Sequence, residues 1–245
     1  MLINEIQIAA PTPAQAEQFP FTLPLYRNGL HLRLTNKVTV IAGENGAGKS
    51  TFLEALAVKC GFSSLGGVRG HILTKAYGIN NVGEMTERKF DNTIMSENIK
   101  IFGTPTPAAQ GKGFFLRAEY MTQTLSNFIT ARNYLSRSHG EGIIDVIANF
   151  RNGLFILDEP ETALSISTQL ALVALISETV KKFDAQFIIV THSPIIMGIP
   201  DADFMWVDGN EFQRTDYRTT PHFSLMKSYI TAPEQTIKRF MQEVK

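Results

Sequence analysis

A glycine-rich stretch followed by lysine and serine is the first place where the residue types predict chemistry. Gly43 is followed, after four residues, by Gly48, Lys49 and Ser50. This is the spacing of a phosphate-binding loop between a strand and a helix. The glycines let backbone N–H groups approach phosphate oxygens, and the following helix points its positive dipole end at the same anion. In such a loop Lys49 contacts the β- and γ-phosphates of a nucleotide, and the Ser50 hydroxyl ligates Mg²⁺.

The segments on either side of this loop fit that interpretation. Residues 38–42 form a short apolar, β-branched run, which is typical of a buried parallel strand. Residues 50–60 carry apolar side chains on one face and are followed by Gly61, which predicts a helix that ends there. A strand, loop and helix in this order favour a nucleotide site over a chance glycine-rich turn.

Two adjacent carboxylates form the second candidate site. Asp158 and Glu159 directly follow the apolar run 154–157 and precede a proline. Parallel sheets bind ligands outside the carboxyl ends of their strands, so we expect both acids beside the phosphate-binding loop. Asp158 would hold Mg²⁺ there, directly or through water. Glu159, whose side chain should point the other way along a strand, would polarise a water for attack on the γ-phosphate.

A histidine follows the next apolar strand. Residues 186–191, QFIIVT, are mostly apolar, which predicts another buried strand, and they lead directly into His192. The same topological argument places this side chain at the ligand-binding edge, where it can donate a hydrogen bond to a γ-phosphate oxygen. A structural histidine with satisfied hydrogen bonds is the alternative, and the residues by themselves leave both interpretations open.

A polar segment precedes an apolar helix predicted over residues 143–150. Within it, Ser138 suits a helix N-cap, and Glu141 follows at the capping-box spacing. Residue types alone therefore indicate a helix start at this point.

The remaining pattern predicts an α/β chain. Strands are expected at residues 2–9, 26–34, 114–119 and 204–207, and helices at residues 121–133, 165–183 and 233–244, the second of them largely buried and the last with a basic side. Residues 11–24 hold four prolines and should be irregular. Phe21 and Tyr26 are candidates to stack on adenine, although a core position is the favoured interpretation of both.

The composition changes between residues 61 and 113. Half of the chain's 18 glycines fall in this interval, and helices tolerate glycine poorly. We therefore expect short strands and loops here, inserted between the first helix and the next buried strand.

Composition limits the class of protein. The chain has 245 residues and is 44% hydrophobic, which is enough for a sizeable core, and its 23 basic and 23 acidic residues leave no net charge. Bulk charge therefore does not indicate a nucleic-acid partner. Cys60 is the only cysteine, so no disulfide can form within the chain. The start lacks a signal-peptide pattern and no apolar run could span a bilayer, so we expect a cytoplasmic protein without direct membrane insertion.

The segments GENGAGKS, LSRSHGEG, LFILDEPETALS and IIVTHSP, in this order, resemble the motifs of ATP-binding-cassette (ABC) ATPases. The chain is similar to the soluble stand-alone members, often labelled AAA-family ATPases, that are related to chromosome-maintenance (SMC) and recombination-repair enzymes. The resemblance spans residues 38–194. It implies a single P-loop NTPase domain over residues 1–245 with a mostly parallel central sheet, an antiparallel β insertion near residues 61–113 and a short helical subdomain near residues 120–150.

The resemblance also implies roles for individual residues. The nucleotide, ATP, would be held by Gly43, Asn45, Gly46, Ala47, Gly48, Lys49, Ser50 and Thr51 of the Walker A loop, and by Ser138 and Gly140 of the signature motif. The metal, Mg²⁺, would be held by Ser50, Asp158 and Glu119, and the catalytic residues would be Glu159, His192 and Glu119. His139 stands where the signature motif has a glycine, and Glu119 stands where the family has its Q-loop glutamine. Residues 163–165 resemble the D-loop.

The implied mechanism is an ATP-dependent homodimer in which two chains enclose two ATP molecules. The first candidate function is a soluble ATPase switch that acts on nucleic acid or a partner protein, in repair or phage defence. The alternative is the nucleotide-binding subunit of an ABC transporter. The short interval from Glu119 to Ser138 favours the switch, because transporter subunits use a longer helical subdomain there. The absence of a long heptad arm argues against a dedicated DNA machine, and Glu159 argues against a non-enzymatic nucleotide sensor.

Overall fold

The computed structural model describes residues 1–69, 93–104, 109–117, 139–162 and 164–243. Its strands are β1 (Glu5–Ile8), β2 (Leu30–Arg33), β3 (Val38–Gly43), β4 (Gly67–Val68), β5 (Ile99–Phe102), β6 (Gly113–Arg117), β7 (Gly153–Asp158), β8 (Ala185–Val190), β9 (Asp203–Val207) and β10 (Phe212–Arg214). Its helices are α1 (Pro13–Ala16), α2 (Lys49–Lys59), α5 (Thr93–Asn98), α7 (His139–Phe150), α8 (Ile166–Lys182), α9 (Pro194–Met197), α10 (Pro221–Thr231) and α11 (Pro233–Glu243), with the short 3₁₀ turns η1 (Pro24–Tyr26) and η4 (Tyr217–Thr219).

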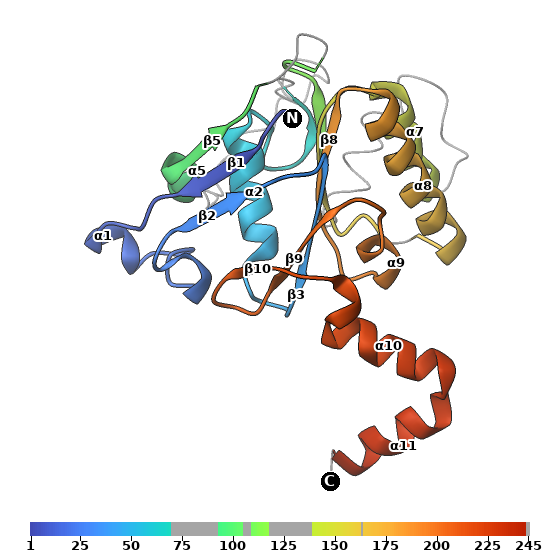
Figure 1. Cartoon of the computed structure of the whole chain (residues 1–245). Helices are drawn as coiled ribbons and strands as arrows, with labels where there is room; N and C mark the ends of the chain where they lie inside the picture. Colours follow the sequence, from blue (N-terminus) through green and yellow to red (C-terminus); the bar gives the residue numbers. More distant parts are fainter. Residues whose placement is uncertain (70–92, 105–108, 118–138, 163, 244–245) are drawn as a thin grey trace, which may run out of the picture.

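The central sheet has seven strands in the order β10-β9-β3-β8-β7-β6-β4. The strands from β9 to β6 run parallel, and the two edge strands β10 and β4 pair antiparallel to their neighbours. The mostly parallel α/β sheet expected from the sequence is therefore confirmed. Because these strands are parallel, the carboxyl ends of β3, β7 and β8 lie at one edge of the sheet. Figure 1 shows β3 and β8 side by side.

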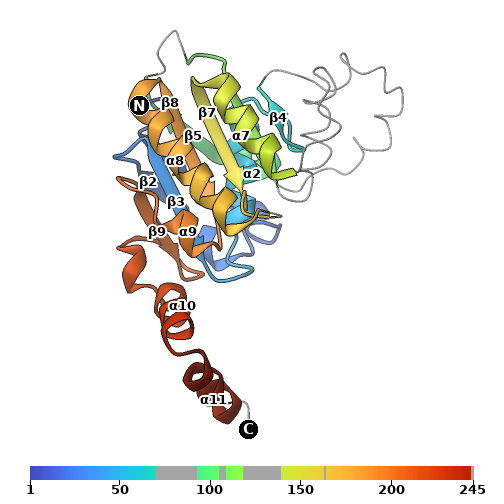
Figure 2. The same ribbon diagram turned by 90° about the vertical axis from the view of Figure 1, so that its right-hand side faces the viewer.

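Both faces of this sheet are covered, which explains why the central strands are apolar at every position. Along β7, Ile156 belongs to the core on one face, whereas Phe155 and Leu157 belong to the core on the other. The helices α7, α8 and α9 lie on the second face (Figure 2), and α2 lies on the first face together with a smaller sheet. Phe155 stacks on Phe187 of β8 at 4.6 Å between ring centroids.

The smaller sheet is antiparallel, with the order β2-β1-β5. Its strand β2 is shorter than the strand expected at residues 26–34, because Tyr26 lies in the turn η1. The strand β5 comes from the glycine-rich interval, and its pairing with β1 ties that interval to the start of the chain.

The glycine-rich interval differs from the expectation of strands and loops alone, which was wrong for residues 93–98. These residues form the helix α5, and its sequence TIMSEN contains no glycine. The next glycines along the chain come after β5, so they do not interrupt this helix. Residues 70–92 and 105–108 of the interval, and the helix expected at residues 121–133, lie outside the described residues.

The helix α8 is buried on one face only, so the expectation that it is largely buried was wrong. Leu172 and Ile176 are fully buried against the sheet, whereas Ile166 and Leu170 are 68% and 56% exposed. Ser165 caps this helix by accepting a hydrogen bond from the backbone N–H of Thr168.

The C-terminal part contains two elements that the sequence pattern did not indicate, β10 and α10. Thr220 caps α10 and Pro221 occupies its first turn. The expected closing helix is present as α11, and α10 and α11 together project from the body as a helical hairpin (Figure 1). Among the helices of the described residues, none combines the length and the apolar character needed to cross a bilayer.

Candidate functional site

The phosphate-binding loop lies between the end of β3 and the start of α2, at the carboxyl edge of the sheet. Gly43 has φ +147°, and a Cβ atom there would lie 2.1 Å from the carbonyl oxygen of Val207. Gly48 is left-handed, with φ +95°, and caps the N-terminus of α2. Both positions therefore require glycine for a backbone reason, in agreement with the loop predicted from the sequence.

Tyr26 supports this loop from the core of the protein and does not contact a nucleotide base. Its side chain is fully buried, and its hydroxyl donates a hydrogen bond of 2.6 Å to the carbonyl oxygen of Gly48. Burial raises the pKa of the Tyr26 hydroxyl far above its usual range, so the group stays a donor. Phe21 is also fully buried. The core interpretation of both aromatics is confirmed, and neither can stack on adenine.

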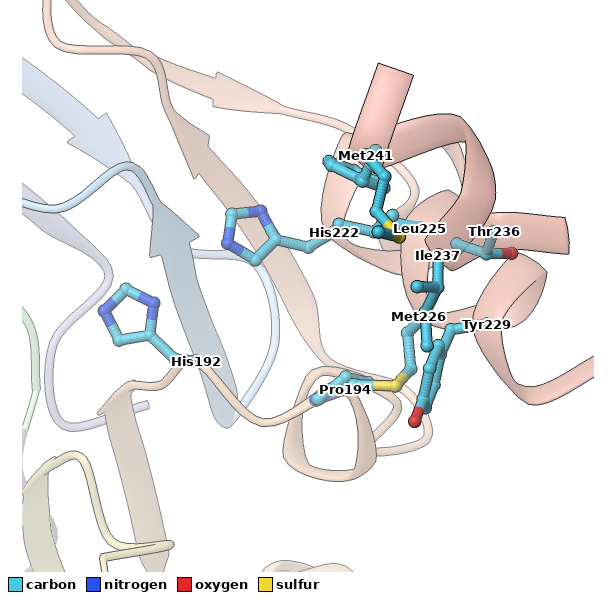
Figure 3. Close-up of a pocket in the computed structure, with 10 residues that line it drawn as sticks. His192, Pro194, His222, Leu225, Met226, Tyr229, Thr236, Ile237 and Met241 are labelled. Carbon is cyan, nitrogen blue, oxygen red and sulfur yellow. The ribbon is translucent and has the colours of Figure 1, made fainter. Parts of the chain in front are cut away.

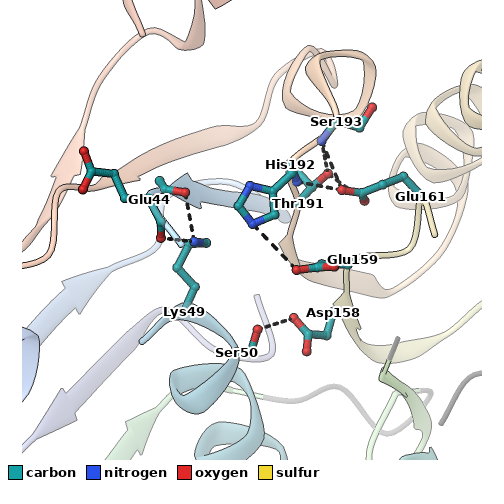
Figure 4. Close-up of polar contacts among 10 residues, drawn as sticks. Glu44, Lys49, Ser50, Asp158, Glu159, Glu161, Thr191, His192 and Ser193 are labelled. Atoms are coloured by element: carbon teal, nitrogen blue, oxygen red, sulfur yellow. Dashed lines mark hydrogen bonds and ion pairs between the residues drawn. The ribbon is translucent and has the colours of Figure 1, made fainter. Parts of the chain in front are cut away.

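Lys49 is buried at the start of α2 with its ammonium group turned into the loop. It donates hydrogen bonds to the carbonyl oxygens of Gly43, at 2.9 Å, and Glu44, at 2.6 Å (Figure 4). Burial lowers its pKa, and the charges of Glu159 and Asp158 oppose that shift. Both of these hydrogen bonds go to neutral carbonyl oxygens, so the partly desolvated cation is electrostatically suited to receive a phosphate.

Ser50 and Asp158 meet across the gap between α2 and β7. The Ser50 hydroxyl donates a hydrogen bond of 3.0 Å to Oδ1 of Asp158. The Asp158 side chain is buried at the carboxyl end of its strand. A hydroxyl and a carboxylate oxygen at this separation are the hard oxygen ligands that Mg²⁺ prefers, so these residues fit the ion that the sequence predicts.

Glu159 leaves the strand by a route that the sequence argument did not foresee. Strand β7 ends at Asp158, and Glu159 has a left-handed backbone with φ +47°. The side chain of Glu159 is therefore directed by this left-handed backbone conformation, and the expected alternation of side chains along a strand does not apply to it. Its Oε1 lies 3.7 Å from Nε2 of His192 (Figure 4).

His192 lies just beyond β8 and faces the same site. Burial lowers the pKa of its imidazole, and the nearby charge of Lys49 lowers it further, whereas Glu159 and Glu161 act in the opposite direction. The imidazole is therefore neutral at pH 7 and able to donate one hydrogen bond and accept another. Its ring also lies 6.3 Å from the ring of His222 on α10.

Glu161 is a member of the site that the sequence argument missed. One carboxylate oxygen accepts hydrogen bonds from the backbone N–H groups of His192, at 2.6 Å, and Ser193, at 3.1 Å. The other oxygen accepts a hydrogen bond of 2.8 Å from the Thr191 hydroxyl (Figure 4). Glu161 thus fixes the backbone that carries His192. The acid follows Asp158 and Glu159 closely in the sequence, but only the fold brings it to residues 191–193.

These groups surround a cavity of about 280 Å³ at the edge of the sheet. It is lined by Phe19, Leu23, Asn45, Gly46, Gly48, Lys49, Ser50, Thr51, Glu159 and His192. Most of the predicted site residues thus line one cavity. Phe19, which is 43% exposed, was missed because it lies in a segment expected to be only irregular.

The predicted residues from the signature region are described only in part. Glu119, Ser138 and Ala163 lie outside the described residues. Gly140 belongs to the first turn of α7, which begins at His139. The predicted helix at residues 143–150 is thus confirmed, with an earlier start.

Comparisons with known proteins agree with this geometry. The family model described as "AAA domain" matches residues 21–193, which is most of the chain. The DNA repair protein RecN of Rickettsia typhi is 27% identical over 147 residues, covering 58% of this chain and 26% of RecN. The hemin import ATP-binding protein HmuV of Hahella chejuensis is 23% identical over 223 residues, covering 76% of this chain and 85% of HmuV.

A solved structure shows the same fold. The chain is similar to cbiO1 from Clostridium perfringens, part of the ABC transporter complex cbiONQ, with a TM-score of 0.50 and 15% sequence identity over 98% of this chain and 99% of that chain. The present chain spans only about a quarter of the length of RecN, 26%. The matched residues include the loop, the paired carboxylates and His192, and on this basis the chain belongs to the AAA domain family.

Proposed function

We propose that this chain binds ATP with Mg²⁺ in the cavity at the edge of the sheet and hydrolyses it to ADP and phosphate. The observation that carries the proposal is the convergence of Lys49, Ser50, Glu159 and His192 on one cavity, with Asp158 in hydrogen-bond contact with Ser50. Three separate strand ends supply these groups, and each has the chemistry that phosphoryl transfer requires.

Binding of the triphosphate uses the loop and its lysine. The N–H groups at the start of α2 and the Lys49 ammonium group would contact the β- and γ-phosphates. Lys49 would exchange its contacts with the carbonyl groups of Gly43 and Glu44 for charged phosphate oxygens. Phe19, exposed at the rim of the same cavity, is the residue placed to stack on the base.

Hydrolysis uses the opposite side of the cavity. Glu159 would accept a proton from the attacking water, and neutral His192 would donate a hydrogen bond to a γ-phosphate oxygen. Mg²⁺, when bound by Ser50 and Asp158, supplies charge that stabilises the phosphate oxygens. Glu161 would hold His192 at the correct distance through its backbone. Glu119 remains proposed as a further metal ligand and catalytic residue in place of the family's glutamine.

A second copy completes the site in this proposal. Ser138 and Gly140 would contact the γ-phosphate bound to the partner chain, so ATP would join two chains and hydrolysis would release them. The released and joined states would act on a protein or nucleic-acid partner. Support comes from the resemblance of the signature segment and from the match to RecN, which is described as a DNA repair protein.

The transporter alternative has its own support. The matches to HmuV, described as an import ATP-binding protein, and to cbiO1, part of a transporter complex, cover most of both proteins. Co-purification separates the two functions: a transporter subunit would be recovered with a membrane protein, whereas a soluble switch would be recovered with a soluble protein or nucleic acid when Glu159→Gln traps the ATP state.

Light scattering behind size-exclusion chromatography tests the ATP-dependent dimer. Glu159→Gln in Mg-ATP should be dimeric, and the same protein without nucleotide should be monomeric. Ser138→Arg, added to Glu159→Gln, should prevent the dimer by steric bulk while ATP still binds. A protein that stays monomeric in saturating Mg-ATP, or an equally stable dimer without nucleotide, would contradict the proposal.

A further inference from the structure

The helical hairpin formed by α10 and α11 exposes an unusual amount of apolar surface. Tyr229, Ile230, Ile237 and Met241 are 48%, 71%, 48% and 65% exposed, and further apolar side chains lie between them. The hairpin projects from the edge of the sheet where the nucleotide cavity lies, and only its first turns approach the body (Figures 1 and 2). An apolar surface of this extent on one element is typical of an interaction site.

The two helices enclose a groove of about 680 Å³ that begins at the nucleotide site (Figure 3). The end nearest the body is formed by His192, Pro194 and His222, and the walls farther out are apolar side chains of α10 and α11, including Met226 and Ile237. The groove and the nucleotide cavity therefore share His192 as a lining residue.

The chain carries a second apolar surface that could fill this groove. Ile166 and Leu170 are 68% and 56% exposed, and their spacing places them on one side of the first turns of α8. This helix follows directly after Asp158, Glu159 and Glu161, at the same edge of the sheet. The opposite side of α8 is already packed on the sheet, so Ile166 and Leu170 remain available to another molecule.

We propose that the groove of one chain binds the start of α8, around Ile166 and Leu170, of a second copy of this chain. The proposal rests on the ATP-dependent pairing proposed above and adds a clasp to it. In a two-fold dimer each hairpin would hold the partner's α8, so the contact would be made twice. ATP binding would then be coupled to the clasp through His192, which borders both the nucleotide cavity and the groove.

The charges around both surfaces agree with this pairing. Residues 162–173 contain no charged side chain, so burying the start of α8 would leave no charge without a partner. On the hairpin, the guanidinium of Arg239 lies over the Phe240 ring, 5.5 Å from its centroid, at the border of the groove. It can remain in solvent while Phe240 is covered, because its charge lies outside the apolar lining.

The first test measures the dimer dissociation constant of Glu159→Gln in Mg-ATP by analytical ultracentrifugation. Met241→Glu should weaken the dimer at least about tenfold, since a carboxylate would be buried in the groove. Gln242→Glu is the matched control, because it adds the same charge at the next exposed position of α11. On α8, Leu170→Glu is the test and the exposed neighbour Ala171→Glu is its control. Both controls should stay within about twofold of the parent.

A cross-link tests the identity of the contact. Met241→Cys in one chain and Leu170→Cys in a differently tagged chain, mixed and oxidised with copper phenanthroline, should give a disulfide between the two chains only in Mg-ATP. Cys60 does not interfere, because it is buried and burial raises the pKa of its thiol to about 12. A chain carrying both substitutions that forms the bond within itself would contradict the clasp.

The outcomes separate the clasp from the proposed function. A dimer that forms in ATP, is unaffected by Met241→Glu and Leu170→Glu and gives no cross-link would overturn the clasp and leave the ATPase dimer standing. A parent that binds ATP yet never dimerises would overturn both the dimer and the clasp. Loss of dimer in the two glutamate variants, with ATP affinity unchanged and controls normal, supports the clasp.

Discussion

The carboxylate of Glu161 accepts the backbone N–H of His192 at 2.6 Å, and this contact joins the acidic segment after β7 to the histidine after β8. The same oxygen also accepts the N–H of Ser193. Glu161 does not itself face the proposed γ-phosphate position, but it fixes the backbone of His192, which does. Glu161 is a positioning residue, and its effect should appear in the chemical step more than in binding.

Glu161→Gln keeps the shape of the side chain but loses one acceptor oxygen. We expect kcat for ATP hydrolysis to fall by about 10- to 100-fold while the dissociation constant for ATP changes by about twofold or less, because His192 moves and the loop does not. Steady-state kinetics and calorimetric titration measure the two effects. Glu178→Gln, which removes an exposed carboxylate from α8, is the control. Equal loss of binding and kcat would show a general structural defect instead.

Lys49→Ala should abolish measurable ATP binding. The variant loses charge-assisted hydrogen bonds to the phosphates, and a loss of at least about 100-fold in affinity is expected from the strength of such bonds. Isothermal titration calorimetry measures the effect. Lys59→Ala, at the exposed end of the same helix, should bind ATP as the parent does. Unchanged affinity in Lys49→Ala would place the phosphates elsewhere.

Phe19→Ala tests the proposed stacking on the base. ATP affinity should fall roughly tenfold, the effect of losing one aromatic platform, whereas the affinity for inorganic tripolyphosphate should not change. Phe102→Ala removes a phenylalanine of similar exposure, 44%, from the small sheet and serves as the control. Equal loss of ATP and tripolyphosphate affinity would mean that Phe19 supports the loop and does not contact the base.

The lowered pKa of His192 predicts a stability effect at acid pH. Burial, then Lys49, holds this pKa below the ordinary value of 6.5. Below pH 6.5 the unfolded chain therefore binds a proton that the folded chain does not, and the free energy of unfolding falls as the pH falls towards the pKa of the folded state. His192→Asn lacks this contribution. Urea unfolding measures the free energy of unfolding of parent and variant. The difference between the two should be constant above pH 7, and at lower pH the parent should lose more stability than the variant. A difference independent of pH would contradict the shift.

The sequence predicted the parts of the site that depend on neighbours in the chain. Each of these parts follows an apolar run that predicts a buried parallel strand, and polar or charged residues come directly after the run, at the edge of the sheet. They are the loop around Lys49, the carboxylates at the end of β7 and the histidine after β8. The central strands were predictable for the same reason, because burial on both faces leaves an uninterrupted apolar run.

The remaining features depend on contacts between distant segments, which no local pattern encodes. Glu161 contacts residues 191–193 only because β7 and β8 are neighbours in the sheet, and Phe19 lines the cavity from the turn between α1 and η1. The strand β10 is short and largely exposed, so it lacks periodicity. The helix α10 was missed although Thr220 and Pro221 are typical of a helix start. Its apolar side chains are not buried in the core, so they do not follow the pattern of a helix packed on a sheet.

Phosphate release by Glu159→Gln tests the central claim most directly. Glu159 is placed as the base for the attacking water, so its amide should leave ATP binding intact and lower turnover by about two to four orders of magnitude. Glu44→Gln, which changes an exposed acid of the loop, is the control and should keep nearly full turnover. Turnover in Glu159→Gln close to that of the parent, with ATP bound equally well, would contradict the assignment of Glu159 and with it the account of this site.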